Sequence, residues 1–493
     1  MKNLREARHS LLWIAVFCLS IAIVPLSWIT GLRGTDHSYG DEVAAPALMR
    51  DGRVNTALPQ DFEAWWERSF PWRSSLVSLW NRAQQTLFHS SGSERIVVGR
   101  DGWLFFAETL PDHSGSSPLT DLDLRRIART LELEREYLAR QDIRFHVALA
   151  PNKATLYPEK MPVWLERWLA PAEPARHIER LGAELAATAP KVDWIDLETP
   201  LRAAKTAAGE HGLYHALDSH WNQEGAQLAA AVLGQAMEVD QEALRALAPT
   251  VWRHDWPADL ARMYYPDRVT HDWQCYLDLP QTYQFTRAVR SVEDVRFATL
   301  APDGSGHLYT IRDSFSNVLV DIWSRLFAAV DYDRAFPHAL TTAAASGCDR
   351  ILLLIAERNL ASWLQGTPVL PAPSRDPAAL GPGDLASLPT LSLDCRAELS
   401  KRGELGHLNV RWDGDDTAAR SVTRVLLALG DEWYEAFPLC EDENAHDHVI
   451  TPGFSLYLED MDVLESFIGQ HGARLEGARL LVETDGSWFL RID

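Results

Sequence analysis

Short apolar segments alternate with longer amphipathic segments between residues 122 and 356, and this alternation constrains the fold more than any other feature of the sequence. The apolar segments have the length of buried strands, and the segments between them repeat apolar residues with the period of a helix. Strands separated by helices pair in parallel, so the pattern predicts an α/β domain over residues 96–365 with a parallel sheet flanked by helices. The expected strands are residues 145–150, 192–197, 307–311 and 351–356, and the expected helices are residues 122–141, 175–187, 225–237 and 314–327.

We predict that residues 35–95 form a tether and membrane-proximal helices. Apolar residues follow a helical period over residues 61–89, and Pro71 interrupts them, so we expect two helices or a kink. A hairpin with strands at residues 96–98 and 103–106 and a turn at Asp101-Gly102 should follow. We assign most of the tryptophans, those of the helical segment included, to the core.

The N-terminus has the pattern of a membrane anchor. Residues 9–32 contain no Lys, Arg, Asp or Glu, and a helix of that length runs about 36 Å at about 1.5 Å per residue, enough to cross a bilayer. Lys2, Arg5 and Arg8 precede the segment, which keeps the N-terminus in the cytoplasm by the positive-inside rule. No small-x-small cleavage motif follows, so we predict an uncleaved single-pass anchor over residues 1–34, with a cleaved signal peptide as the alternative.

The C-terminal part of the chain has the composition of a separate unit. Residues 366–390 contain six prolines and predict a linker. Residues 391–493 predict a small acidic α+β domain, because Lys and Arg number 10 and Asp and Glu number 23 from residue 374 onward (10 − 23 = −13). We expect hairpins at residues 391–399 with 405–412 and at residues 478–493, and helices at residues 417–429 and 458–470.

Charge and cysteine content exclude several classes of function. The formal charge of −22 argues against nucleic-acid binding, which needs a basic surface. Outside the predicted anchor, no cysteine has CxxC spacing, so the sequence predicts no metal site. In an oxidising compartment these cysteines could form disulfides, for example between Cys395 and Cys440, although spacing cannot assign the pairs. The cysteines concerned are Cys275, Cys348, Cys395 and Cys440.

The densest group of chemically active residues is the run from Asp218 to Gly225. Asp218 lies two residues before His220, and in extended backbone both side chains can point the same way. The carboxylate can then accept the Nδ1–H of the imidazole, fix its tautomer and stabilise its charged form. The alternative is a purely structural pair.

A second group follows the predicted strand at residues 307–311. Ser314 opens the next helix, where backbone N–H groups and the helix dipole can stabilise an anion that forms beside its Oγ. The alternative is a helix cap supplied by Asp313 or Ser314. The two groups together supply a nucleophile, a base and an orienting carboxylate, and a serine needs such a base.

Several motifs resemble the alginate O-acetyltransferase family. The segment Gly99-Arg100-Asp101-Gly102-Trp103-Leu104-Phe105 is similar to its Gly-Lys-Asp-Gly-Trp-Leu-Phe signature. The resemblance covers roughly residues 60–365 and includes, in the same order, residues 66–73, 150–159, 218–221, 258–263 and 312–315.

This resemblance implies an SGNH-hydrolase-like domain that acts outside the cytoplasm without a cofactor. It implies that Ser314 is the nucleophile, His220 its base and Asp218 the orienting acid. An acetyl group would rest on Ser314 as an ester and pass to a hydroxyl of an exported polysaccharide, alginate-like or another exopolysaccharide. The resemblance also implies a membrane-bound O-acyltransferase partner as acetyl donor, and an inner-membrane anchor with the catalytic domain in the periplasm suits that arrangement. The alternatives are an acetyl esterase with the same triad and a non-catalytic scaffold of an export complex.

Four further residues are candidates for binding the substrate. Lys153 and Tyr157 follow a predicted strand, where α/β sheets place ligand loops, although a structural loop explains them equally well. Trp221 adjoins His220, and Arg312 precedes Asp313-Ser314. Arg312 could bind an anionic sugar, pair with Asp313 or lie on the surface. Glu357-Arg358 follows another predicted strand, and we expect a buried ion pair there.

Overall fold

The computed structural model describes most of the chain. It covers residues 43–492 except 51, 115, 117–118, 169–174, 249–250, 365, 382–384, 413–420, 440–451 and 485, together with short pieces between residues 13 and 37. The predicted anchor falls mostly outside these residues. Within the described part of the chain, no helix combines the length and the apolar composition needed to cross a bilayer.

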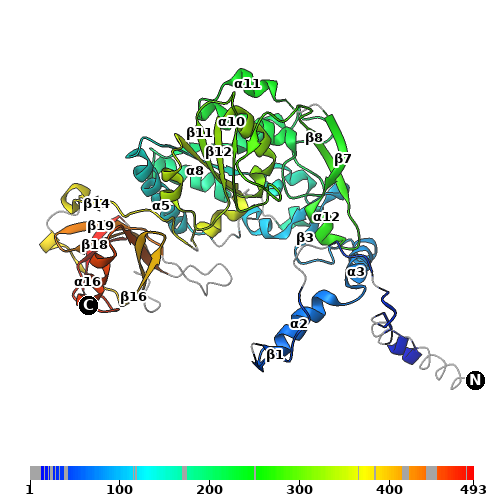
Figure 1. Cartoon of the computed structure of the whole chain (residues 1–493), viewed down its shortest axis with the longest axis horizontal. Coiled ribbons are helices and arrows are strands. Elements are labelled where there is room, and N and C mark those ends of the chain that lie inside the picture. Colours follow the sequence, from blue (N-terminus) through cyan, green and yellow to red (C-terminus); the bar gives the residue numbers. More distant parts are fainter. Residues whose placement is uncertain are drawn as a thin grey trace, which may run out of the picture.

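The predicted parallel sheet forms the centre of the molecule (Figure 1). Its first five strands in spatial order pair in parallel: β6 (Asp193–Ile195), β5 (Arg144–Ala150), β13 (Arg350–Ala356), β11 (His307–Arg312) and β12 (Ala329–Asp333). Two antiparallel strands, β10 (Arg296–Leu300) and β9 (Gln284–Phe285), extend one edge. The four strands expected from the sequence are therefore present, and β12, β10 and β9 are additions to them.

Helices cover both faces of this sheet, because the central strands are apolar on both sides. Ile351 and Leu353 of β13 pack on one face, and Leu352 and Leu354 pack on the other. The first face is covered by α5 (Asp121–Ala139), α8 (His177–Thr188) and α14 (Leu340–Ala345). The second face is covered by α9 (Glu198–Ala204), α10 (Gln223–Ala236) and α13 (Val320–Leu326).

Short helices connect these elements. They are η2 (Ala107–Thr109), α4 (Leu110–His113), α6 (Lys153–Leu156), η3 (Pro158–Lys160), α7 (Val163–Trp168), α11 (Gln241–Ala246), η4 (Ser314–Leu319) and η5 (Glu357–Leu364). The predicted helix at residues 314–327 is thus a 3₁₀ segment, η4, followed by α13.

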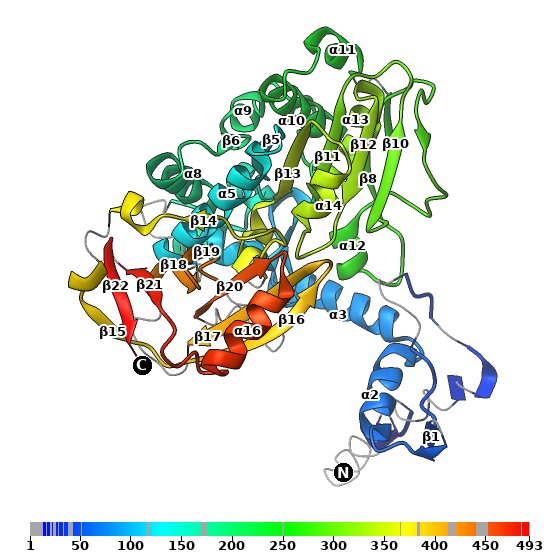
Figure 2. The same ribbon diagram turned by 60° about the vertical axis from the view of Figure 1, so that its left-hand side comes forward.

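The segment before the sheet forms two separate helices, as the break at Pro71 predicts. They are α2 (Leu58–Ser69) and α3 (Arg73–Phe88), and a small hairpin of β1 (Met49–Arg50) and β2 (Arg53–Val54) precedes them. Figure 2 shows α2 projecting away from the body of the molecule, with α3 between them. The predicted hairpin follows as β3 (Ile96–Val98) and β4 (Leu104–Phe106), joined by η1 (Arg100–Gly102).

A second hairpin, which the sequence did not predict, lies between α11 and the rest of the sheet. It consists of β7 (Val251–Pro257) and β8 (His271–Tyr276), with α12 (Asp259–Tyr264) in its connection. Its strands carry His, Asp and Trp on exposed positions, so they lack the apolar alternation that marks a strand. This insertion brings Trp256 and Asp259 to the site described below.

The described residues of the C-terminal unit form an α+β structure in which a helix packs on two sheets. One sheet contains β14 (Ser374–Arg375), β19 (Glu432–Ala436), β18 (Val422–Leu429), β21 (Leu480–Thr484), β22 (Ser487–Ile492) and β15 (Thr390–Ser392). The other contains β16 (Cys395–Arg402), β17 (Leu405–Trp412) and β20 (Gly453–Leu458), and α16 (Met461–His471) packs on the core between the sheets. Both predicted hairpins are present, β16 with β17 and β21 with β22.

One predicted helix in this unit is wrong. The described part of residues 417–429 is the strand β18 (Val422–Leu429). Val425 and Leu427 pack into the core between the sheets, while Leu426 and Ala428 pack under the opposite side of the strand. A strand that is buried on both faces has a continuous apolar run, which cannot be distinguished from a buried helix by periodicity.

The C-terminal unit is docked on the central sheet through α5. Leu405, Phe437 and Tyr457 join the apolar core on the α5 face of that sheet. The segment predicted as a linker takes part in this packing, because Leu370 is buried and Thr367 bonds the Tyr457 hydroxyl at 2.8 Å. The suggested Cys395–Cys440 disulfide involves Cys440, which lies outside the described residues.

A buried carboxylate joins the two units. Glu435 of β19 accepts hydrogen bonds from Arg129 of α5 at 2.7 Å, from Arg375 at 2.7 Å and from Arg424 at 2.9 Å. Burial would raise the pKa of Glu435, but the charges of Arg129 and Arg424 outweigh it and lower the pKa to about 2. Ionised Glu435 is therefore held between three guanidiniums.

Replacement of Glu435 by alanine should destabilise the protein by about 3 kcal/mol, at the lower end of the range for a broken buried pair, because the arginines keep some contact with water. Equilibrium unfolding in urea measures the loss, with the exposed Glu465→Ala as control. Since the folded pKa is depressed, the contribution of Glu435 is complete above about pH 4.5 and is lost as the pH falls through about 2. Equal stability of the two variants would contradict this assignment.

Candidate active site

Ser314 lies at the carboxyl end of β11, on the turn that begins η4. Asp313 caps this turn, because its Oδ1 accepts the Phe315 N–H at 2.9 Å. Its Oδ2 accepts the Ala356 N–H at 2.6 Å and the Asn359 side-chain N–H at 2.7 Å, both from the end of the neighbouring strand β13 and the start of η5. Asp313 therefore caps the turn, and the capped turn holds Ser314 at the end of β11.

The Asp218–His220 pair comes from a loop that precedes α10. Tyr214 and Trp221 form a β-bridge across the base of this loop, and the His215 N–H donates to the His220 carbonyl at 3.2 Å. The backbone bends at residues 216–220 instead of running extended as expected, and the Asp218 Oδ1 accepts the His220 N–H at 3.0 Å, which turns the carboxylate toward the histidine.

The structure brings Asp218, His220 and Ser314 into one hydrogen-bonded chain. The Asp218 Oδ1 lies 2.7 Å from the His220 Nδ1, and the His220 Nε2 lies 2.8 Å from the Ser314 Oγ. An ionised carboxylate only accepts, so Nδ1 carries the proton and Nε2 is free to accept the Ser314 O–H. This is the geometry of a nucleophile, a general base and an orienting acid.

The electrostatics of this chain favour a strong base. Burial opposes the charge on His220, but the charge of Asp218 and its hydrogen bond outweigh burial and raise the pKa of the imidazole. For Asp218, burial would raise the pKa, but the same partnership with His220 lowers it far below its ordinary value. Asp218 is therefore ionised whenever His220 functions as a base.

Two residues of the β7–β8 insertion hold the outer oxygen of Asp218. Its Oδ2 accepts the Asp259 N–H at 2.9 Å and the Trp256 indole N–H at 3.2 Å. The Asp259 carboxylate in turn accepts the Ser219 N–H at 2.7 Å and lies 3.5 Å from the His220 Nδ1. Burial, followed by the charge of Asp218, raises the pKa of Asp259.

Among the described residues, Asp218, His220 and Asp259 are the group whose ligand atoms lie close enough for a metal ion, within 4.8 Å of one another. Donor N–H and O–H groups already bond both carboxylates, and the His220 Nδ1 bears a proton directed at Asp218. A cation would have to displace these donors, so the arrangement suits proton transfer better than metal binding.

The four residues predicted to bind the substrate are buried, and each is hydrogen-bonded to another part of the protein. The Lys153 ammonium donates to the carbonyls of residues 215, 216 and 218, the last at 2.7 Å. The Tyr157 hydroxyl accepts the Leu213 N–H at 2.8 Å. Both side chains therefore shape the loop that carries Asp218 and His220, and burial lowers the pKa of Lys153 to about 8.

Trp221 and Arg312 instead support the turn that carries Ser314. The Trp221 indole N–H donates to the carbonyl of Phe315 at 2.8 Å. The Arg312 guanidinium donates to the Asn317 side chain at 2.7 Å and to the Val292 carbonyl at 2.6 Å. It also lies over the rings of Phe297 and Tyr332. These motif residues therefore support the loop and the turn that carry the triad.

Glu357 and Arg358 do not form the predicted ion pair. Glu357 is buried and accepts the Asn152 N–H and the Thr155 hydroxyl, each at 2.8 Å. Burial, reinforced by Asp112, raises its pKa well above the ordinary value. The Arg358 guanidinium points elsewhere, with its central carbon 5.1 Å from the Phe315 ring centroid. Its charge opposes protonation of His220. The sequence did not predict that Arg358 lies near His220, because two adjacent residues of opposite charge suggest an ion pair with each other.

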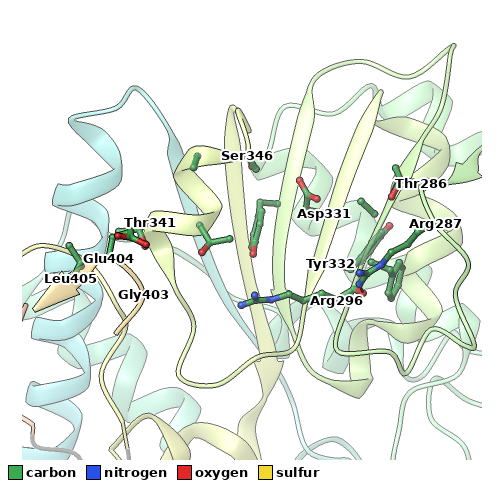
Figure 3. Close-up of a pocket in the computed structure, with 15 residues that line it drawn as sticks. Thr286, Arg287, Arg296, Asp331, Tyr332, Thr341, Ser346, Gly403, Glu404 and Leu405 are labelled. Carbon is green, nitrogen blue, oxygen red and sulfur yellow. Dashed lines mark hydrogen bonds between the residues drawn. The ribbon is translucent and has the colours of Figure 1, made fainter. Parts of the chain in front are cut away.

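A cavity of about 770 Å³ lies elsewhere, between the edge of the central sheet and the turn joining β16 and β17 (Figure 3). None of the triad residues lines it. Its charged groups have partners within the protein, since Asp331 accepts from His307 at 2.7 Å and Arg296 donates to Asp333 at 3.0 Å. The candidate site is therefore the triad, not this cavity.

The match to known proteins falls on the domain that carries the triad. Residues 96–294 match the family model described as "SGNH hydrolase-like domain, acetyltransferase AlgX". The resemblance to the alginate O-acetyltransferase family is confirmed.

Two relatives described as "Probable alginate O-acetylase AlgJ" are each 30% identical to this chain. The one from Pseudomonas aeruginosa matches over 181 residues, 37% of this chain and 42% of the relative. The one from Azotobacter vinelandii matches over 190 residues, 38% of this chain and 44% of the relative. The chain thus spans less than half the length of these two relatives.

Solved structures also align with this chain. The "O-Acetyltransferase Domain of Pseudomonas putida AlgJ" is 17% identical, with 54% of this chain and 91% of that chain covered and a TM-score of 0.34. Bacillus cereus PatB1 is 15% identical, with 54% of this chain and 96% of that chain covered and a TM-score of 0.41. These TM-scores are too low to transfer the position of any side chain.

Lys153→Met should destabilise the protein by about 1.5–3 kcal/mol, because three loop carbonyls lose a charged donor. It should also slow the reaction of Ser314 with a sulfonyl fluoride, since the Asp218–His220 loop loses its internal support. Urea unfolding and intact mass measure the two effects, with the exposed Lys191→Met as control. If Lys153→Met keeps both the stability and the reactivity of the unsubstituted chain, the positioning role is wrong.

Proposed function

We propose that the chain is a serine O-acetyltransferase that passes an acetyl group through Ser314 to a hydroxyl of an exported polysaccharide. The observation that carries the proposal is the continuous hydrogen-bonded chain from Asp218 through His220 to the Ser314 Oγ. The SGNH hydrolase-like acetyltransferase model over residues 96–294 and the relatives named as probable alginate O-acetylases support an acetyl group and a polysaccharide acceptor.

The geometry supplies both halves of the reaction. The His220 Nε2 takes the proton of the Ser314 hydroxyl while Oγ attacks the carbonyl carbon of an acetyl donor. The imidazolium then returns that proton to the leaving group, and acetyl-Ser314 remains. In the second half, Nε2 takes the proton of an acceptor hydroxyl, whose oxygen attacks the ester and releases Ser314, which recovers its proton from His220.

The start of η4 offers a donor for the oxyanion of both tetrahedral intermediates. Asp313 engages the N–H groups of Phe315 and Ser316, through its side chain at 2.9 Å and its carbonyl at 3.3 Å. The N–H of Ser314 itself is then the first of this turn that can face an oxyanion beside its own Oγ.

The sequence supports an inner-membrane location with the catalytic domain in the periplasm. Residues 9–32 lack charged side chains and follow Lys2, Arg5 and Arg8, as in a single-pass anchor. Such an anchor would hold the domain beside a membrane-bound O-acyltransferase that supplies the acetyl group. The acceptor is an exopolysaccharide, and alginate is one candidate.

The first test gives p-nitrophenyl acetate to the full chain with and without an oligosaccharide acceptor. The unsubstituted chain should form an acetyl adduct and acetylated sugar, whereas Ser314→Ala should form neither, because it lacks the nucleophile. Intact mass and chromatography of the sugar measure the products. Free acetate as the sole product would make the chain an esterase. Equal behaviour of both chains would refute the catalytic assignment and favour the scaffold.

The second test uses pH. His220 must be neutral to accept a proton, so kcat/KM should rise with pH and level off above a midpoint higher than the ordinary value of 6.5, because Asp218 raises the pKa. Asp218→Asn should lower kcat on the order of 10⁴-fold and move the midpoint downward. The exposed Asp303→Asn serves as the matched control. A midpoint that does not respond to Asp218→Asn would contradict the role of Asp218.

A further inference from the structure

The helix α3 buries its polar face and exposes its apolar face, the reverse of a helix that packs on a globular core. Its buried side chains are polar, namely Ser74, Ser78 and Asn81, which lie on one face at a spacing of four and three residues. Its apolar side chains point outward, with 51% of Leu76, 63% of Leu79, 56% of Trp80 and 69% of Leu87 exposed. Leu76, Trp80 and Leu87 fall on one stripe, because they lie four and seven residues apart.

Specific hydrogen bonds hold the helix in this orientation. The Ser78 hydroxyl donates to the Asp267 carboxylate at 2.6 Å. The Asn81 side chain donates to the Tyr264 carbonyl at 2.7 Å, and the Tyr264 hydroxyl donates to the Asn81 carbonyl at 3.2 Å. The polar face is therefore docked on the catalytic domain, and a simple rotation that buried the leucines would break all of these bonds.

The neighbouring helix α2 carries a cluster of aromatic side chains that are not buried. None of its residues is buried. Phe62 and Trp66 stack at 6.1 Å between ring centroids, and Trp66 meets Phe70 edge-on at 5.6 Å. This finding corrects the assignment of Trp66 to the core, because its ring packs on Phe62 and Phe70 and is partly exposed.

The charge of this segment differs from that of the rest of the chain. Residues 43–95 contain six arginines against five Asp and Glu, a net charge of +1 in a chain of −22. The helix α3 contains Arg73 and Arg82 and no acidic residue. An anionic surface would repel the acidic body of the protein but not this segment.

The segment is also continuous with the predicted anchor. The Trp72 indole N–H, just before α3, donates to the Ser27 hydroxyl at 2.8 Å, and the Ser74 hydroxyl donates to Asp36 at 2.8 Å. The end of the uncharged segment of residues 9–32 is therefore fastened to the start of α3. Figures 1 and 2 both show α2 and α3 on the side of the molecule from which the N-terminal segment leaves.

We propose that the outward faces of α2 and α3 lie in the boundary between headgroups and acyl chains of a phospholipid bilayer. Exposed Leu, Phe and Trp with flanking Arg and little net charge are the composition of helices that lie in this boundary. An exposed apolar patch of this kind otherwise costs free energy in water. The proposal rests on this surface and is independent of the acetyltransferase assignment. In this arrangement α3 contacts both the bilayer and the catalytic domain, and it therefore fixes the distance between the triad and the membrane.

The test places a nitroxide label at Leu79→Cys in the full chain, reconstituted in vesicles of phosphatidylethanolamine and phosphatidylglycerol. Power saturation with oxygen and with a water-soluble nickel chelate reports the depth of the label. Gln470→Cys, an exposed position on the C-terminal helix α16, is the matched control. Label taken up by the unsubstituted chain, which has its own cysteines, is subtracted.

The proposal expects oxygen to relax the label at position 79 several-fold more than the nickel chelate does, with the reverse order at position 470. A label at position 79 that the nickel chelate reaches as readily as at position 470 would show a face in water and overturn the proposal. A label that neither reagent reaches would show a face covered by a second copy of the chain, and would overturn it equally.

Discussion

The carboxylate of Asp218 is the interaction on which the rest of the site depends. It is buried, and it remains ionised there because four donors surround it: the His220 side chain and N–H, the Asp259 N–H and the Trp256 indole. The backbone carbonyl of Asp218 accepts a hydrogen bond from the Lys153 ammonium. Three separate segments of the chain, the end of β5, the loop before α10 and the β7–β8 insertion, therefore converge on one residue. Burying a charge is costly unless it is bonded in this way.

The sequence contained enough information to predict the triad and the sheet that carries it. Asp218 and His220 lie two residues apart, and Ser314 follows a strand and opens a helix, so the spacing allows a triad. The resemblance to the alginate O-acetyltransferase family then implied the role of each residue. Long apolar strands such as β5 and β13 alternate with amphipathic helices in the sequence. Strands that are connected by helices usually pair in parallel. What could be predicted is thus what depends on short-range periodicity and spacing.

The remainder depends on contacts between distant segments, which periodicity does not reveal. Trp221 adjoins His220 in the sequence and Lys153 lies in the separate motif of residues 150–159, yet both side chains are buried, so motif membership indicated importance but not role. The sequence of β18 was mistaken for a helix because both faces of the strand are buried, which makes its apolar run continuous. The helix α3 shows the reverse case: its apolar period predicted a helix correctly, but the protein buries the polar stripe and leaves the leucines outside.

The central claim is that Asp218 holds His220 in the tautomer and at the basicity that Ser314 requires. Nitrogen and proton NMR of the full chain with ¹⁵N-labelled histidine measures both properties of His220, with Asp218→Asn to assign its signals. The account predicts a hydrogen-bonded Nδ1 proton far downfield, an unprotonated Nε2 at high pH and a titration midpoint above the ordinary histidine value. A neutral His220 protonated at Nε2, with an ordinary or lowered midpoint, would contradict the account.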